Sequence, residues 1–221
     1  DPPSVLMNCP ESNGALVEEK DLIRELAGIS QSTPIILYQG GYSNNRGLRN
    51  LITSAQYFKD GKLVMMGWGN IEDELRELAQ KKGLDNSVCF IPPAPQNELL
   101  YWSASADVGI IPYRAVGMNN YYSCPNKLFE YINSGLPVAG SAFPEISKII
   151  NGWNLGKTFD PEDPQSIGHT VNAILFESNN LQTMKTNAFE AAKQLNWQCE
   201  SKTLLDLYAT LDVDGMHING A

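Results

Sequence analysis

The chain has 221 residues, 43% of them hydrophobic, which is enough for one full-sized hydrophobic core. With 25 acidic against 16 basic residues its net charge is −9, so no basic face is expected for nucleic acid or another polyanion. Four scattered cysteines and two histidines predict reduced thiols, as in a cytosolic protein, and no metal site. Without an apolar run of about 18 residues or a signal-like start, neither a membrane span nor a signal peptide is expected.

Short β-branched segments alternate with helical patterns from Pro34 onward. The segments expected as strands are residues 35–39, 62–66, 88–91, 107–113, 136–140 and 155–159. The helical patterns between them cover residues 48–58, 72–83, 97–106 and 144–150. Because the strands are apolar throughout, both faces of their sheet must be covered. The alternation predicts a doubly wound, Rossmann-like α/β fold: a six-stranded parallel sheet with helices on both faces.

The two ends of the chain depart from this alternation. Residues 1–32 indicate an entering strand and a helix over residues 18–27. After Phe159 come three successive helical patterns, the first opened by Asp163 and Pro164. These extra C-terminal helices would complete a domain over residues 33–211, and residues 212–221 are expected to form a disordered tail.

Candidate binding residues follow the strands, because ligands of open parallel sheets bind at the carboxyl ends of strands, where strand order reverses. The first strand is followed by GGYSNNRGL, in which Gly40 and Gly41 would let a ligand approach the backbone closely. Asn44 or Asn45 could cap a helix that Arg46 begins. Free amides and a guanidinium at a helix start would form a phosphate site, although a simple turn is the alternative.

The next strands are followed by three different connections. GWGN, residues 67–70, is a second glycine-rich turn, with Trp68 as a candidate rim residue. PPAP, residues 92–95, lacks amide donors and together with Ile91 could form a wall for a flat ring. RAVGMNNYYSCPN, residues 114–126, is a long excursion that is either functional or disordered.

The segment SCPNKLFEYINSGLPV predicts an anion-binding helix start. Ser123 or Cys124 can serve as N-cap, with Pro125 at the first helical position. The amides expected to point outward are those of Asn126, Lys127 and Leu128. Glu130, one turn in, could accept hydrogen bonds from two neighbouring hydroxyls, as on a ribose. Together with Arg46, these residues describe a pocket for a nucleoside diphosphate.

Four stretches resemble retaining GT-B glycosyltransferases of the family-4 type. PNKLFEYINSGLPVAGSAFPEI is similar to the family's donor-binding motif, approximately P-x-K-x-x-E-Y-x-A-x-G-x-P-V-V. QGGYSNNRGL resembles its G-R-L-x-x-x-K-G loop, and SVCFIPPAPQNELLYWSASADVGIIPY and NWQCESKTLLDLYATL resemble the intervening segment and the terminal helix. The resemblance covers residues 33–211, the C-terminal half of such enzymes, so residues 1–32 would lead in from an acceptor domain that is absent.

The resemblance implies roles for individual residues. Arg46 would contact the donor diphosphate, Glu130 the ribose, and Ile91 the base through its backbone. The catalytic set would be Arg46, Lys127 and Glu130, with no metal ligand. The donor-binding set would be Gly40, Gly41, Tyr42, Gly67, Ile91, Tyr122, Ser123, Cys124, Pro125, Asn126 and Leu128.

Two positions depart from the family's pattern. The arginine of G-R-L is Gly41 here, and a second glutamate, eight positions before the ribose glutamate, is Tyr122. We hypothesise that Lys127 partly replaces the missing arginine, because it lies at a helix start facing the same anion.

The activity implied is transfer of a sugar from a nucleotide-sugar donor with retention of configuration and no obligatory cofactor. The acceptor, a glycan, a lipid-linked molecule or a small molecule, would bind the absent domain, so the isolated chain is expected to bind nucleotide without turnover. The setting implied is cytoplasmic biosynthesis of a cell-surface polysaccharide or glycoconjugate, with at most peripheral membrane contact. The alternatives are a nucleotide-sugar epimerase of the same architecture and a non-catalytic nucleotide-binding or scaffold module.

Overall fold

A computed structural model describes residues 5–11, 21–177 and 180–213. Its centre is a six-stranded, all-parallel sheet in the order β3-β2-β1-β4-β5-β6. The strands are β1 (Ile35–Tyr42), β2 (Lys62–Gly69), β3 (Val88–Ile91), β4 (Val108–Ile111), β5 (Val138–Ser141) and β6 (Gly156–Phe159). Strand order therefore reverses between β1 and β4, and the predicted doubly wound α/β fold is confirmed.

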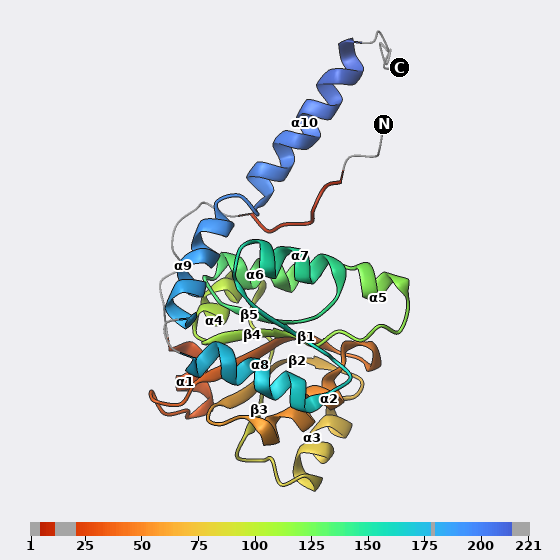
Figure 1. Cartoon of the computed structure of the whole chain (residues 1–221). Helices are drawn as coiled ribbons and strands as arrows, with labels where there is room; N and C mark the ends of the chain where they lie inside the picture. The colour runs from red at the N-terminus through yellow and green to blue at the C-terminus, as the bar shows by residue number, and fades with distance from the viewer. Residues whose placement is uncertain (1–4, 12–20, 178–179, 214–221) are drawn as a thin grey trace.

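Helices cover both faces of the sheet (Figure 1). One face packs against α1 (Leu22–Ala27), α4 (Leu99–Ala104), α6 (Asn126–Asn133) and α7 (Pro144–Gly152). The other packs against α2 (Leu48–Ser54), α3 (Glu72–Lys81) and α8 (Pro164–Phe176). The remaining elements are α5 (Met118–Tyr122), α9 (Asn180–Ala192), α10 (Trp197–Val213) and the 3₁₀ turns η1 (Asn44–Arg46), η2 (Ala55–Tyr57) and η3 (Gln96–Glu98).

The two apolar clusters explain why each strand is apolar throughout. In β1, Ile35 and Leu37 point into the cluster under α6 and α7, whereas Ile36 and Tyr38 point into the cluster under α2 and α8. All four side chains are completely buried. A strand buried on both faces is apolar at every position instead of alternating polar and apolar residues. Such continuous apolar runs are typical of parallel sheets.

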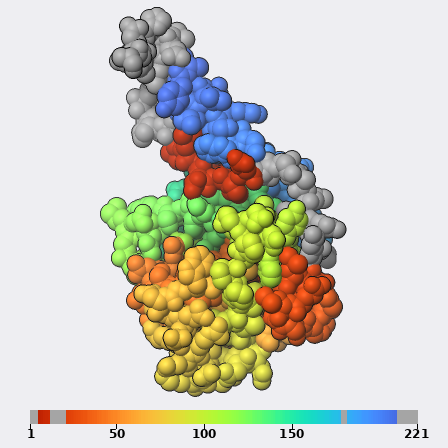
Figure 2. All heavy atoms as spheres, turned by 180° about the vertical axis from the view of Figure 1, so that it is seen from behind, coloured from red at the N-terminus to blue at the C-terminus, as the bar shows by residue number. Residues whose placement is uncertain are grey.

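The prediction for the N-terminal end was partly wrong. Residues 5–11 form no strand, and they run beside the base of α10, where the Trp197 amide donates to the Pro10 carbonyl (Figure 2). The Met7 amide donates to Glu200 of the same helix. The first helix begins at Leu22, and the predicted start at residues 18–20 lies outside the described residues.

The prediction of a disordered tail was wrong at its first two residues. Helix α10 continues to Val213, so residues 212 and 213 are helical, and the rest of the predicted tail lies outside the described residues. The helix projects away from the sheet (Figure 1). Across the described residues, none of the helices combines the length and apolarity that a bilayer crossing requires.

Candidate functional site

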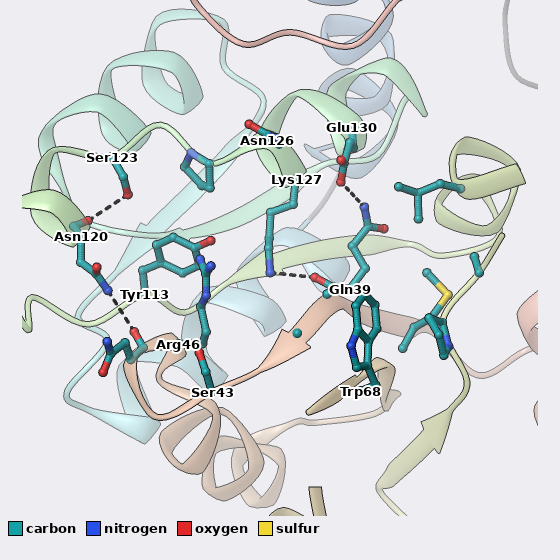
Figure 3. Close-up of a pocket in the computed structure, with 18 of the residues that line it drawn as sticks. Gln39, Ser43, Arg46, Trp68, Tyr113, Asn120, Ser123, Asn126, Lys127 and Glu130 are labelled. Atoms are coloured by element: carbon teal, nitrogen blue, oxygen red, sulfur yellow. Dashed lines mark hydrogen bonds between the residues drawn. The ribbon is translucent and has the colours of Figure 1, made fainter. Parts of the chain in front are cut away.

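A cavity of about 580 Å³ opens at the carboxyl ends of β1 and β2, beside the reversal of strand order (Figure 3). The ends of β1 and β2, the connections after β1, β3 and β4, and the start of α6 form its walls. The lining residues are Gln39, Gly40, Gly41, Ser43, Asn45, Arg46, Met66, Trp68, Pro93, Ala94, Gln96, Leu99, Tyr113, Asn119, Asn120, Ser123, Pro125, Asn126, Lys127 and Glu130. The location is the one that an open parallel sheet favours for a ligand.

Gly40 lies in the part of β1 that lines the cavity. Its φ of +120° lies in a region that residues with a side chain rarely adopt. A Cβ at this position would stand 3.4 Å from the Lys127 Nζ. The glycine therefore permits the backbone conformation, whereas a Cβ would meet the ammonium group only at ordinary van der Waals distance.

The start of α6 differs by one position from the prediction. Pro125 is the N-cap residue rather than the first helical residue, and neither Ser123 nor Cys124 caps the helix. The Leu128 amide donates to the Pro125 carbonyl at 2.9 Å, so it is not one of the free donors predicted. The amides of Asn126 and Lys127 remain in the first turn, where a helix offers no internal acceptor.

Lys127 is buried although it carries an ammonium group. Its side chain extends from α6 toward β1 and donates from Nζ to the Gln39 carbonyl at 2.7 Å (Figure 3). The same Nζ lies 3.9 Å from the ring centroid of Tyr38 and 5.6 Å from that of Tyr113. Burial, and then repulsion from Arg46, lower the pKa of Lys127 to about 7, against attraction from Glu130. An anion bound here would raise the pKa of Lys127 and so favour its charged form.

Arg46 reaches the same cavity from a 3₁₀ turn. The turn η1 ends at Arg46, and α2 begins only at Leu48, so the predicted helix beginning at Arg46, with Asn44 or Asn45 as cap, was wrong. Gly47 has φ +71°, and a Cβ there would lie 1.8 Å from the Pro112 carbonyl oxygen. The Arg46 guanidinium stacks 4.4 Å from the centroid of the Tyr113 ring. Stacking holds the guanidinium while leaving its N–H groups for a ligand.

Glu130 lines the cavity one turn into α6. Its Oε2 accepts a hydrogen bond of 2.6 Å from the Gln39 Nε2. Burial raises the pKa of Glu130, whereas this hydrogen bond, and then the charge of Lys127, lower it. The cavity thus combines two cations with one carboxylate, a set that suits an anion joined to a group bearing hydroxyls.

Much of the predicted site set meets at the cavity. The members that line it are Gly40, Gly41, Arg46, Ser123, Pro125, Asn126, Lys127 and Glu130. Within the described residues, the members that do not line it are Tyr42, Gly67, Ile91, Tyr122, Cys124 and Leu128.

Packing explains why these six lie elsewhere. Tyr42 points into the core and donates from its hydroxyl to the Met65 carbonyl. Gly67 is pressed against β1, since a Cβ would lie 2.0 Å from the Gly40 carbonyl oxygen. Ile91 and Leu128 belong to the core cluster, and Cys124 packs against it. Tyr122, 55% exposed, stacks edge-on against Tyr121 outside the cavity.

Several lining residues were not predicted. Gln39 is the polar residue that ends the continuous buried run of β1, and Tyr113 follows β4. Asn120 lies in α5 and donates from its side chain to the Asn45 carbonyl, which joins the excursion to the loop after β1. A polar residue at the end of an apolar strand was the available signal for Gln39. Helix α5 has only five residues, too few for an apolar periodicity.

Comparison with known proteins identifies the family. The family model described as Glycosyl transferases group 1 matches residues 19–191. An uncharacterized glycosyltransferase of Methanocaldococcus jannaschii is 25% identical over 197 residues, covering 86% of this chain and 48% of that relative. The chain thus spans about half the length of this curated relative.

Solved structures share the fold. The Anabaena protein HepE in complex with UDP-glucose has a TM-score of 0.79 at 16% identity, over 94% of this chain and 57% of that chain. The C-terminal domain of a group 1 family glycosyl transferase (LpcC) from Francisella tularensis has a TM-score of 0.63 at 18% identity, over 84% and 94% of the respective chains. The fold is that of the C-terminal domain of GT-B glycosyltransferases, and the chain belongs to the family of group 1 glycosyl transferases.

Proposed function

We propose that this chain binds the nucleotide-sugar donor of a glycosyltransferase, and that the whole enzyme transfers the sugar with retention of configuration. The observation that carries the proposal is the convergence of Arg46, Lys127 and Glu130 on one cavity at the reversal of strand order. The complexes of HepE with UDP and with UDP-glucose favour a uridine nucleotide as the first donor to test.

In the proposed complex, the diphosphate lies between Arg46, Lys127 and the first amides of α6. The guanidinium, the ammonium and the helix start stabilise the charge that develops on the diphosphate as the bond to the sugar breaks. Glu130 accepts hydrogen bonds from the ribose hydroxyls and so orients the nucleotide. This electrostatic stabilisation requires no obligatory metal or other cofactor.

The acceptor would bind another domain of the whole protein, so the chain alone should bind nucleotide without turnover. Cytoplasmic location, with at most peripheral membrane contact, belongs to the same proposal. Multiple turnovers by the purified 221 residues would contradict this division of labour, and the anomeric configuration of the product of the whole enzyme, followed by NMR, tests retention.

Calorimetry with UDP, ADP, GDP and dTDP tests donor binding. We expect one of these nucleotides to bind the wild-type chain, and Arg46→Ala to weaken that binding about ten- to a hundredfold through loss of a charge-assisted contact. Arg76→Ala is the matched control, because Arg76 pairs with Glu72 on α3 and does not line the cavity. Absence of binding by every nucleotide would refute the proposal.

The same substitution in the whole protein separates an enzyme from a scaffold. Loss of sugar transfer in Arg46→Ala supports the enzyme. If Arg46→Ala transfers the sugar at the wild-type rate at both saturating and low donor concentrations, Arg46 does not contact the donor.

A further inference from the structure

Gln39 connects the two charged residues of α6 that face the cavity. It is 3% exposed and lies in β1, the strand beside the reversal of strand order. Its backbone carbonyl accepts from the Lys127 Nζ at 2.7 Å, and its side-chain Nε2 donates to the Glu130 Oε2 at 2.6 Å. Figure 3 shows both contacts, with the Gln39 side chain directed at Glu130 and its carbonyl at Lys127.

Two further contacts fix Gln39 itself. Its side-chain Oε1 lies 2.6 Å from the Ser103 Oγ, a buried donor on α4. Its backbone amide donates to the Tyr131 hydroxyl, which in turn donates to the Leu37 carbonyl. The single hydrogen of the Ser103 hydroxyl is shared between Oε1 and the Leu99 carbonyl oxygen, which lies 2.8 Å from the Ser103 Oγ, while the Gln39 Nε2 donates to Glu130. A hydrogen-bond donor facing Glu130 at 2.6 Å suits an ionised carboxylate.

We propose that Gln39 is the positioning residue for Glu130, and that it sets the preference of the site for a nucleotide with ribose hydroxyls. The inference rests on the proposed function. Gln39 occupies Oε2 of the carboxylate and fixes its orientation, and Oε1 is then the oxygen that accepts from the ribose. The diphosphate does not depend on the Gln39 side chain, because Lys127 contacts the backbone carbonyl.

Because the Gln39 side chain affects the ribose and not the diphosphate, its replacement should change nucleotide binding in a way that a purely structural role would not. Replacing the side chain should reduce recognition of the ribose and leave recognition of the diphosphate intact. It should also raise the pKa of Glu130, since the hydrogen bond from Gln39 opposes the effect of burial. The acidic limit of nucleotide binding should therefore move to higher pH in Gln39→Met.

The experiment measures affinity for UDP and for its 2′,3′-dideoxy analogue by calorimetry, between about pH 5 and pH 8. In the wild type, UDP should bind about tenfold or more tightly than the analogue, since hydrogen bonds to a charged group are lost. In Gln39→Met the ratio should fall to about one- to threefold, while affinity for the analogue stays within about threefold. Gln80→Met, the same chemical change at an exposed glutamine of α3 that does not line the cavity, should keep the wild-type ratio.

A second variant, Gln39→Glu, retains the shape of the glutamine side chain and should make the preference for ribose depend on pH. In Gln39→Glu two carboxyl groups share the position of the 2.6 Å hydrogen bond, so both cannot be ionised at low cost. The preference for ribose should be absent at about pH 8 and return as pH falls, when a proton held by the introduced carboxyl group can be donated to Glu130. Thermal unfolding of each variant verifies that it is folded.

The outcomes separate the two proposals. If wild type binds none of the nucleotides, the proposed function fails. If wild type binds UDP with a preference over its analogue, and Gln39→Met keeps both that preference and the wild-type pH profile, the proposed function stands and the role of Gln39 is refuted. Equal loss of affinity for UDP and for the analogue in Gln39→Met would also refute it, because that pattern indicates structural damage.

Discussion

The two ends of the sheet each contain a buried cation, and the surroundings of these cations are opposite. Arg24, at the amino end, and Lys127, at the carboxyl end, are both 9% exposed. Arg24 is enclosed by acceptors, including a carboxylate. Lys127 faces a cavity and has a second cation, Arg46, among its neighbours. Equal burial therefore serves different purposes at the two ends.

Arg24 ties the first helix to the sheet. Its Nη2 donates to the Asp107 Oδ2 at 3.0 Å, and its Nη1 donates to the Ser30 and Thr33 carbonyls. The same Asp107 oxygen accepts from the Ile35 amide at 2.8 Å, at the start of β1. The charges of Arg24 and Asp107 neutralise each other, and the cluster connects α1, β1 and the residue before β4. No ligand is needed to balance the buried charge.

Lys127 has no such match. In the part of the chain that the structure describes, no carboxylate lies within ion-pair distance of its Nζ, whose contacts are a carbonyl oxygen and two tyrosine rings. Burial of an ammonium without an ion pair costs free energy in the folded state. Groups with perturbed pKa values of this kind concentrate at functional sites, and an anionic ligand would supply the missing partner.

The largest effect is expected for Arg24→Met. Removing the guanidinium leaves Asp107 without its cation, and we expect the free energy of unfolding to fall by about 3 kcal/mol or more. Urea unfolding followed by circular dichroism measures it. Nucleotide affinity of the folded variant should not change. Adding Asp107→Asn should recover part of the loss, and a decrease below about 1 kcal/mol in the single variant would mean that the pair acts like an exposed one.

Lys127→Met is the matched change at the other end of the sheet. It should weaken nucleoside-diphosphate binding about ten- to a hundredfold, because one charge-assisted contact is lost. Its free energy of unfolding should stay the same or rise, since an ammonium no longer has to be buried. Calorimetry and urea unfolding measure the two quantities. If Lys127→Met lowers the free energy of unfolding as much as Arg24→Met does, Lys127 stabilises the fold as Arg24 does, and the two cations do not differ in role.

The sequence was sufficient for the fold because apolar runs and helical periodicity report on burial directly. The ends of elements were less predictable. β1 and β2 extend to Tyr42 and Gly69, beyond their continuous apolar runs, because backbone pairing continues the ladder to the last residue of each strand. Hydrogen bonding between strands, rather than hydrophobicity, decides where such strands end.

At the site, glycines and charges after the strands predicted the backbone turns and the facing helix start. The direction of individual side chains was not predictable. Tyr42 follows Gly40 and Gly41 but points into the core, and Leu128 follows Lys127 but belongs to the core cluster. The role inferred for Gln39 depends on Glu130, 91 residues away, and on Ser103, 64 residues away. Contacts of that range leave no pattern in a single sequence.

The smallest expected effect is a change of protonation that sharpens the contrast further. The pKa of Lys127 is lowered to about 7 by burial and by Arg46, so at about pH 8 most of the free protein carries a neutral amine. A bound diphosphate favours the ammonium, so binding at this pH should take up about 0.5–1 proton. Because the complex holds more protons than the free protein, affinity should fall as pH rises above about 7.

Calorimetry of UDP binding at about pH 8 in two buffers with different ionisation enthalpies measures this uptake. Lys127→Met is the control, and its observed binding enthalpy should not depend on the buffer. Proton uptake that persists in Lys127→Met would assign it to another group. Absence of uptake in the wild type would mean that Lys127 is already charged before the ligand arrives. In that case its nearby carbonyl and rings compensate the buried charge as fully as Asp107 compensates Arg24.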